Sequence, residues 1–310
     1  MRKFNDDFLK LIVGGEMRSG TTFLANFLNS QQGISVYADF LRSPIVEGRK
    51  LGITDIRRSL TDREKNVLVS NMIAESRIMN LPQYNDLSRD DFDSWDDFFE
   101  LALGMLNDTS EKLSVAGVKV TREYHYYLSL LDANYRIVYL YRDPRDVILS
   151  AKNRFGDFNL YEYAMRWSDS MKFADELKEN RGFHAVKFEN LIENPEQEVE
   201  KLADFIGVDL EVNINTLVQR KGVDYVDNSS FGDISKTFDK SAIWRWKKNS
   251  DDRDVVAVSA ALGNELAKYD YDILDVEPGS THRAKKQYAK FTRNQKIKTM
   301  LKKWGNKLIK

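Results

Sequence analysis

Apolar residues in this chain gather in short continuous runs that alternate with segments of helical periodicity. The runs are Leu11–Val13, Ile34–Tyr37, Ser114–Val120, Tyr135–Tyr141 and Phe183–Phe188. Short runs rich in β-branched and aromatic residues predict strands that are buried on both faces. Because helical segments separate them, the pattern predicts an α/β fold with a central parallel sheet flanked by helices.

The helical segments carry recognisable start signals. Helices are expected at Asp62–Asn80, Asp90–Asn107 and Leu160–Arg181. Two more are expected to begin at Asp143-Pro144 and Asn194-Pro195, where the polar residue would cap the helix and the proline would occupy its first turn.

Residues 41–110 follow a less regular pattern and are expected to form an acceptor-binding insertion, since recognition is often built on such segments. Its aromatic residues recur at helical spacing, which fits core packing better than an open cleft.

The first run leads into a glycine-rich turn within Leu11–Leu28, LIVGGEMRSGTTFLANFL. Backbone N–H groups at a helix N-terminus attract anions, and Arg18 and the hydroxyls of Thr21 and Thr22 add further donors. This segment therefore predicts a phosphate-binding loop and a P-loop-type three-layer fold. It is not a Walker A motif, because no lysine follows Gly20.

A second basic turn follows the run that ends at Tyr141. Arg142 comes next, and Ser150 lies eight residues further on, within the expected helix. Ligands of parallel sheets bind at the carboxyl ends of the strands. Two basic turns at strand ends predict a ligand with two separated anionic groups.

These motifs resemble those of sulfotransferases that use 3′-phosphoadenosine 5′-phosphosulfate (PAPS), closest to the tyrosylprotein and carbohydrate types. Arg18–Thr22 is similar to the family's 5′-phosphosulfate loop, and Arg142 with Asp143–Val147 and Ser150 is similar to its 3′-phosphate element. Two later segments match in the same order: Val186–Leu191, followed by Asn194-Pro195, and Trp244–Lys247.

The resemblance implies transfer of a sulfuryl group from PAPS to a hydroxyl acceptor, which leaves the product 3′,5′-adenosine bisphosphate (PAP). The acceptor could be a carbohydrate, a lipid, a peptide tyrosine or a small metabolite, and no metal is expected. The residues implied to bind the cofactor are Arg18, Ser19, Gly20, Thr21, Thr22, Arg142, Ser150, Ser230 and Arg245. Lys119 is implied to lie near the transferred group, together with Arg18.

In-line attack by a hydroxyl requires a general base. The resemblance to the tyrosylprotein type implies Asp39, where that type has a glutamate, and Glu47 and His125 are the alternatives. One position departs from the family, because Phe188 stands where members often have tyrosine.

Two other functions remain open. A P-loop nucleotide kinase-like enzyme would share the glycine-rich loop but would depend on magnesium. A non-catalytic nucleotide-binding protein would keep the pocket and lack turnover.

Composition and charge limit the remaining possibilities. The chain has 310 residues, no cysteine and a net charge of −1, and it shows neither an apolar run long enough to span a membrane nor a signal peptide. A cytoplasmic protein is therefore expected. Residues 282–310 carry 11 Lys and Arg and no Asp or Glu, so residues 1–281 carry −1 − 11 = −12. The acidic body argues against a nucleic-acid partner.

The charge division predicts a sulfotransferase domain over 1–281 and a basic amphipathic tail over 282–310. In the tail, Ile297, Met300, Leu301, Trp304 and Leu308 recur at helical spacing among lysines. This stripe can pack on the domain or on a second subunit, which we favour, or it can lie on an anionic membrane as a peripheral contact.

Overall fold

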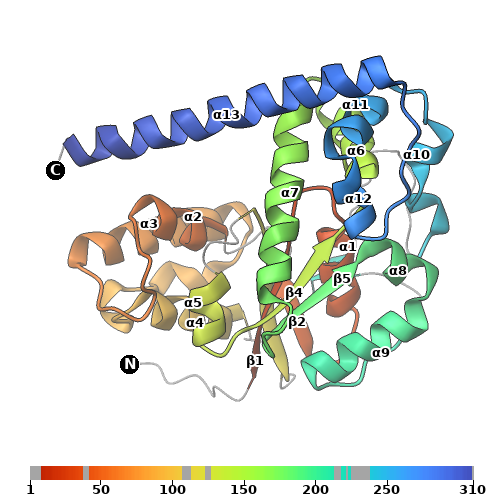
Figure 1. Cartoon of the computed structure of the whole chain (residues 1–310). Helices are drawn as coiled ribbons and strands as arrows, with labels where there is room; N and C mark the ends of the chain where they lie inside the picture. Colours follow the sequence, from red (N-terminus) through yellow and green to blue (C-terminus); the bar gives the residue numbers. More distant parts are fainter. Residues whose placement is uncertain are drawn as a thin grey trace. The chain divides into compact units, whose positions relative to one another are not determined.

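The computed structural model describes residues 8–37, 42–106, 113–122, 127–212, 218–220, 223–224 and 238–308. Within these ranges, five parallel strands form a sheet in the order β2-β3-β1-β4-β5 (Figure 1). The strands are β1 (Leu9–Gly15), β2 (Ile34–Tyr37), β3 (Val115–Thr121), β4 (Arg136–Tyr141) and β5 (Phe183–Lys187). The predicted α/β fold with a central parallel sheet is confirmed.

Helices connect the strands and continue after them. The described helices are α1 (Thr21–Asn29), α2 (Arg42–Lys50), α3 (Asp62–Ile78), α4 (Trp95–Leu106), α5 (Tyr127–Asp132), α6 (Pro144–Phe155), α7 (Leu160–Leu177), α8 (Phe188–Glu193), α9 (Pro195–Ile206), α10 (Arg245–Lys248), α11 (Arg253–Leu262), α12 (Asn264–Lys268) and α13 (Pro278–Leu308). Short 3₁₀ turns are η1 (Pro82–Asp86), η2 (Arg89–Asp91) and η4 (Lys240–Ala242), and a small antiparallel pair joins β6 (Val218–Arg220) to β7 (Val223–Asp224).

Two glycines at the end of β1 show how helices cover both faces of the sheet. Successive strand residues point to opposite faces. A Cβ on Gly14 would lie 2.2 Å from the Tyr127 hydroxyl of α5, whereas a Cβ on Gly15 would lie 2.9 Å from Thr21 Cγ2 of α1 and 2.3 Å from the Leu140 carbonyl. Because these positions carry no side chain, α1 and α5 can approach the central strand from opposite sides.

The chain divides into two compact units, and each is described by itself. The first contains Met1–Tyr141, Glu176–Asn228 and Ile234–Asp239, and the second contains Arg142–Asp175, Ser229–Asp233 and Lys240–Lys310. The sheet with α1 to α5 belongs to the first unit, and α6, α10, α11, α12 and α13 belong to the second. The domain boundary expected at residue 281 stays a prediction.

One predicted strand end and one predicted capping hydrogen bond differ from the structure. The run ending at Phe188 is a strand only as far as Lys187, because Phe188 already belongs to α8. Asn194 precedes Pro195 as expected, but its side chain makes no capping hydrogen bond. Asp143 does cap its helix, since its carboxylate accepts a hydrogen bond from the N–H of Arg145.

The expected insertion buries its aromatic side chains. The aromatic set Phe92, Trp95, Phe98 and Phe99 is at most 2% exposed, and Trp95 stacks on Phe99 with ring centroids 4.9 Å apart. These side chains pack as a core, which agrees with the favoured interpretation of their spacing. The helix predicted from Asp90 begins only at Trp95, and residues 89–91 form the turn η2.

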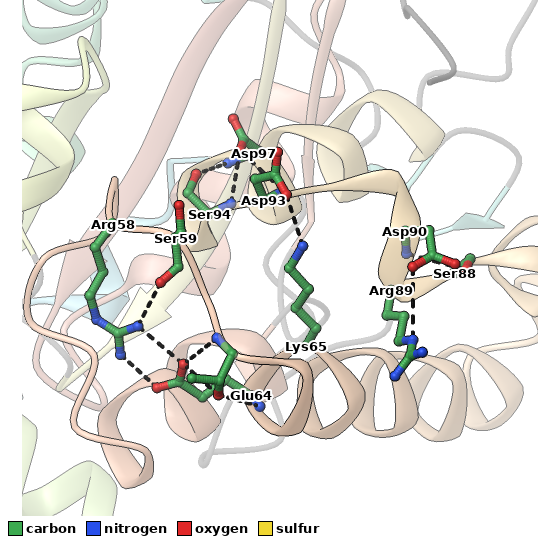
Figure 2. A network of polar contacts seen from close by, with 11 residues as sticks. Arg58, Ser59, Glu64, Lys65, Ser88, Arg89, Asp90, Asp93, Ser94 and Asp97 are labelled. Atoms are coloured by element: carbon green, nitrogen blue, oxygen red, sulfur yellow. Dashed lines mark hydrogen bonds and ion pairs between the residues drawn. The ribbon is translucent and has the colours of Figure 1, made fainter.

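A polar network joins α3 to the segment before α4 (Figure 2). Arg58 makes a bidentate ion pair with Glu64 at 2.6 and 3.1 Å, and Glu64 completes a capping box with Thr61. Lys65 reaches across to Asp93 at 2.9 Å. The side-chain hydrogen bonds to Glu64, the largest from Arg58, lower its pKa to about 2. The network therefore holds the start of α3 through charges as well as through apolar packing.

Candidate functional site

The loop between β1 and α1 has the backbone of an anion-binding turn. Arg18 and Gly20 have φ angles of 68° and 91°, in the left-handed region. Gly20 is the N-cap of α1 and, as a glycine, contributes no capping side chain to the first-turn N–H groups, which attract anions. Ser19 and Thr21 are buried, at 1% and 4% exposure. A phosphate or sulfate group fits this set of donors.

Lys119 of β3 is brought to the same loop. Its Nζ donates a hydrogen bond to the Thr22 hydroxyl at 3.3 Å, and its side chain is largely buried. The strand register explains the placement, since β3 pairs with β1 and Lys119 lies opposite Val13, near the start of the loop. The lysine therefore adds a positive charge beside the N-terminus of α1.

An ion pair at this edge of the sheet was not predicted from the sequence. Arg122 Nε lies 3.3 Å from Glu16 Oε2, and the N–H of Arg122 donates to the Gly15 carbonyl. Glu16 belongs to the loop and is buried, so the pair ties the loop to the end of β3. Only the register of the two strands brings these charges together, and the sequence offered no local signal for the pair.

Phe188 packs directly on the glycine of the loop. A Cβ on Gly20 would lie 2.4 Å from the Phe188 ring, and the ring of Phe23 meets Phe188 edge-on at 6.2 Å. The residue at this departure from the family pattern thus forms an apolar wall behind the loop.

Several predicted site residues lie outside the described residues. Asp39, His125 and Ser230 fall in such segments. Glu47, the alternative base, lies on α2 and forms an ion pair with Lys50 one turn later.

The second unit holds the other predicted anion element at the start of α6. Arg142 is 6% exposed, its Nη2 donates to the Ala242 carbonyl and lies 3.6 Å from Asp146 Oδ2, and its own carbonyl accepts from Trp167 Nε1 at 2.9 Å. Ser150 is buried two turns further along α6. The predicted pair is therefore split between the turn before α6, which holds Arg142, and the helix itself, which holds Ser150.

Arg145 has a structural role in the same helix. Its guanidinium donates to both carboxylate oxygens of Asp143 at 2.9 and 2.6 Å, and neither residue is exposed. The guanidinium also lies 3.4 Å from the ring centroid of Trp246, and its Nη1 donates to the Asp272 carbonyl. The arginine thus joins α6 to the later Trp244–Lys247 segment.

Asp146 completes this junction and was not singled out in the sequence. Its Oδ1 accepts from the Trp246 N–H at 2.8 Å, while its Oδ2 faces Arg142. Burial raises the pKa of Asp146, and Arg142 opposes that shift. Arg245 belongs to the same segment, and its Nε donates to the Ser241 carbonyl at 2.7 Å. The sequence resemblance located the segment, but only the structure shows what holds it.

The described residues contain no group of three or more His, Asp or Glu side chains arranged to hold a metal ion. They also contain no helix with the length and apolar character to cross a membrane.

The chain is similar to known proteins both in its sequence pattern and in its fold. The family model described as "Sulfotransferase family" matches residues 11–212. The fold is similar to the sulfotransferase domain from the curacin biosynthetic pathway, at 16% identity and a TM-score of 0.53 over 86% of this chain and 99% of that one. It is also similar to the sulfotransferase domain of the Synechococcus PCC 7002 olefin synthase, at 15% identity and a TM-score of 0.51 over 93% and 97%. No curated protein matches the chain.

Proposed function

Because the chain belongs to the sulfotransferase family, we propose that it transfers a sulfuryl group from PAPS to a hydroxyl acceptor. The donor supplies the sulfuryl group and departs as PAP. The observation that carries the proposal is the cluster of donors at the N-terminus of α1, where Lys119 Nζ lies 3.3 Å from the Thr22 hydroxyl.

The residues present fit an anionic cofactor. In our proposal Arg18, Ser19, Gly20, Thr21 and Thr22 bind the 5′-phosphosulfate, because fixed N–H and cationic donors stabilise the negative charge that builds up on a leaving phosphate. Lys119 supports the same charge from β3.

The 3′-phosphate is assigned to Arg142, which lies just before α6, and to Ser150 within that helix. Arginine suits this role since its planar guanidinium matches phosphate geometry. Arg245 and Ser230 are proposed as further phosphate contacts on the basis of the family motif.

Asp39 is the proposed general base, which takes the proton of the acceptor hydroxyl during attack. Glu47 and His125 remain the alternatives. The acceptor is proposed to be a hydroxyl of a carbohydrate, a lipid, a peptide tyrosine or a small metabolite.

Cofactor binding is tested by thermal unfolding with PAP and, separately, with ATP and magnesium. A ligand at about 100 times its Kd adds roughly 2.7 kcal/mol of stability, which is a readily measured rise in Tm. We expect PAP to raise the Tm and Arg142→Ala to reduce that rise. A Tm that rises with ATP and magnesium but not with PAP would contradict the proposed cofactor.

Catalysis is tested by transfer of labelled sulfate from PAPS to a panel of hydroxyl acceptors. We expect Asp39→Asn to keep the PAP-induced rise in Tm and to lose turnover, while Glu47→Gln and His125→Gln keep both. Wild-type turnover in Asp39→Asn would reject this base, and PAP binding without turnover on any acceptor would favour a non-catalytic protein.

A further inference from the structure

The helix α13 has one face that packs within the second unit. Ala284, Tyr288 and Phe291 follow one another at helical spacing and are buried or half-buried, and α13 lies against α11 (Figure 1). The Tyr161 hydroxyl of α7 donates to Gln287 Oε1 at 2.7 Å. Burial raises the pKa of Tyr288 to about 12, as expected for a phenol removed from water. This face anchors the helix.

The opposite face carries a basic stripe, defined as Arg283, Lys286, Lys290 and Arg293. These residues recur at spacings of three and four, so they lie in one line along the helix, and all four are exposed. The next residue in the same line is Ile297, a large apolar side chain that is 43% exposed. The outward line therefore changes from basic to apolar along its length.

We propose that this line docks α13 on the surface of a membrane that contains anionic lipids. The basic stripe complements the lipid headgroups, and the sequence of residues 282–310 holds no carboxylate side chain to oppose that attraction. An exposed isoleucine in line with the stripe fits the boundary between headgroups and acyl chains, where interfacial helices bury their apolar side chains.

The charge distribution favours a membrane over a nucleic acid. Residues 1–281 carry a net charge of −12, which repels any polyanion that wraps the protein. A membrane meets the helix along one line and also accepts apolar residues. The sequence supplies more of these beyond Ile297, namely Met300, Leu301, Trp304 and Leu308.

The tail sequence allowed either packing on the protein or contact with an anionic membrane, and in our proposal each applies to a different face of α13. The inner face packs within its own unit, and the outer face is left for the membrane. The anchored half keeps the basic stripe outward, so docking needs no unfolding of the helix.

The test is co-sedimentation of the full-length protein with vesicles of phosphatidylcholine, with and without phosphatidylserine. We expect binding only to the phosphatidylserine vesicles, and weaker binding as salt rises. Lys286→Glu combined with Arg293→Glu is expected to weaken binding at least about tenfold. Ile297→Asp, which removes an exposed apolar side chain, is expected to weaken it as well.

The matched control is Lys178→Glu combined with Arg181→Glu, which reverses two exposed basic residues outside α13. We expect it to bind as the wild type does, and all variants to keep the wild-type Tm. If both double variants lost vesicle binding to the same extent, the protein's net charge alone would explain the binding, and the proposal would be overturned.

Three further outcomes would overturn it. These are absence of binding by the wild type, equal binding to vesicles without phosphatidylserine, and tighter retention on a single-stranded DNA oligonucleotide than on the vesicles. A dimer by light scattering that Lys286→Glu with Arg293→Glu converts to monomer would instead assign the stripe to a second copy of the chain.

Discussion

At the scale of single residues, Gly20 satisfies two separate constraints. Its φ of 91° lies in the left-handed region, and the Phe188 ring occupies the space that a Cβ would need. Side chains cost roughly 1–2 kcal/mol in left-handed backbone, before any clash is counted. The position thus requires glycine for backbone geometry and for packing at once.

Gly20→Ala is expected to destabilise the fold by more than the left-handed backbone alone costs and to weaken PAP binding. Gly52→Ala is the matched control, because Gly52 has a φ of 71° and a Cβ added there would meet no described atom within 4 Å. Urea denaturation gives both free energies of unfolding. If both variants lost the same free energy of unfolding, the Phe188 ring would move aside for the added Cβ with no energetic penalty.

Lys119 connects β3 to the loop through its hydrogen bond to the Thr22 hydroxyl, so its removal tests the proposed charge stabilisation. Lys119→Met is expected to lower turnover by roughly 10²–10³, the effect of removing one donor to a developing negative charge. Lys10→Met is the control, since Lys10 lies on β1 and pairs with Glu100 at 3.4 Å. Sulfate transfer at saturating PAPS measures both, and unchanged turnover in Lys119→Met would remove the lysine from the mechanism.

At the scale of elements, the start of α6 combines a cap, a buried ion pair and a stacked aromatic ring. Asp143 caps the helix and holds Arg145, while Arg145 lies over Trp246. A buried ion pair contributes little net stability when complete, but losing one partner leaves an uncompensated charge in the core. The segment Trp244–Lys247 therefore depends on α6 for its position.

Arg145→Ala is expected to lower the free energy of unfolding by about 3–5 kcal/mol, because it leaves the Asp143 carboxylate buried without its arginine. Arg154→Ala, on the exposed face of the same helix, is expected to stay within about 0.5 kcal/mol of wild type. If Arg145→Ala does not fold, Arg145→Lys, which keeps the charge but loses the bidentate geometry, gives the same comparison. An Arg145→Lys protein as stable as wild type would contradict the assigned role.

The start of α3 predicts a pH dependence. The folded-state pKa of Glu64 is about 2, against 4.5 for the ordinary carboxyl, so its carboxylate stabilises the fold above about 4.5. That contribution is lost as pH falls from 4.5 towards 2, when the group is protonated.

Glu64→Gln is therefore expected to be less stable than wild type at pH 7, with a gap that narrows as the pH is lowered through this window. Asp86→Asn, at an exposed carboxylate in the same region, is the control and is expected to show no such gap. Denaturant unfolding at a series of pH values measures the difference in free energy of unfolding between wild type and variant. A difference that stays constant below pH 4 would show that Glu64 acts through packing alone.

At the scale of the whole molecule, each compact unit contributes its own set of proposed anion-binding groups. The loop and Lys119 belong to the first unit, and Arg142 and Ser150 belong to the second. All of them offer positive charge or hydrogen-bond donors to the proposed cofactor. The proposed chemistry thus uses the protein's own cations.

Sulfate transfer is therefore expected to continue unchanged in EDTA, because a sulfuryl group carries less negative charge than a phosphoryl group and the side chains supply the compensation. Turnover assayed before and after chelation is the measurement. A loss of turnover that magnesium restores would point to a metal-dependent mechanism and contradict charge compensation by side chains alone.

The strands, the loop and the order of the family motifs could be predicted from the sequence, because each depends on neighbours close in the chain. Apolar runs define β1, β3 and β4, and glycines on either side of Arg18 mark the loop between β1 and α1. The start of α6 followed from Asp143-Pro144 for the same reason. The start of α9 at Asn194-Pro195 was predicted in the same way, although the Asn194 side chain makes no capping hydrogen bond.

Contacts between distant residues were decided only by the tertiary structure. Strand register places Lys119 on Thr22 and Arg122 on Glu16, about a hundred positions apart in the chain. The fold also places the Arg145 guanidinium over the ring of Trp246, about a hundred positions later in the chain. Packing likewise selected which face of α13 meets its unit and which carries its charge outward. By itself the sequence determined the local elements and the family motifs, while the partners of each charged side chain depended on which elements the fold brought together.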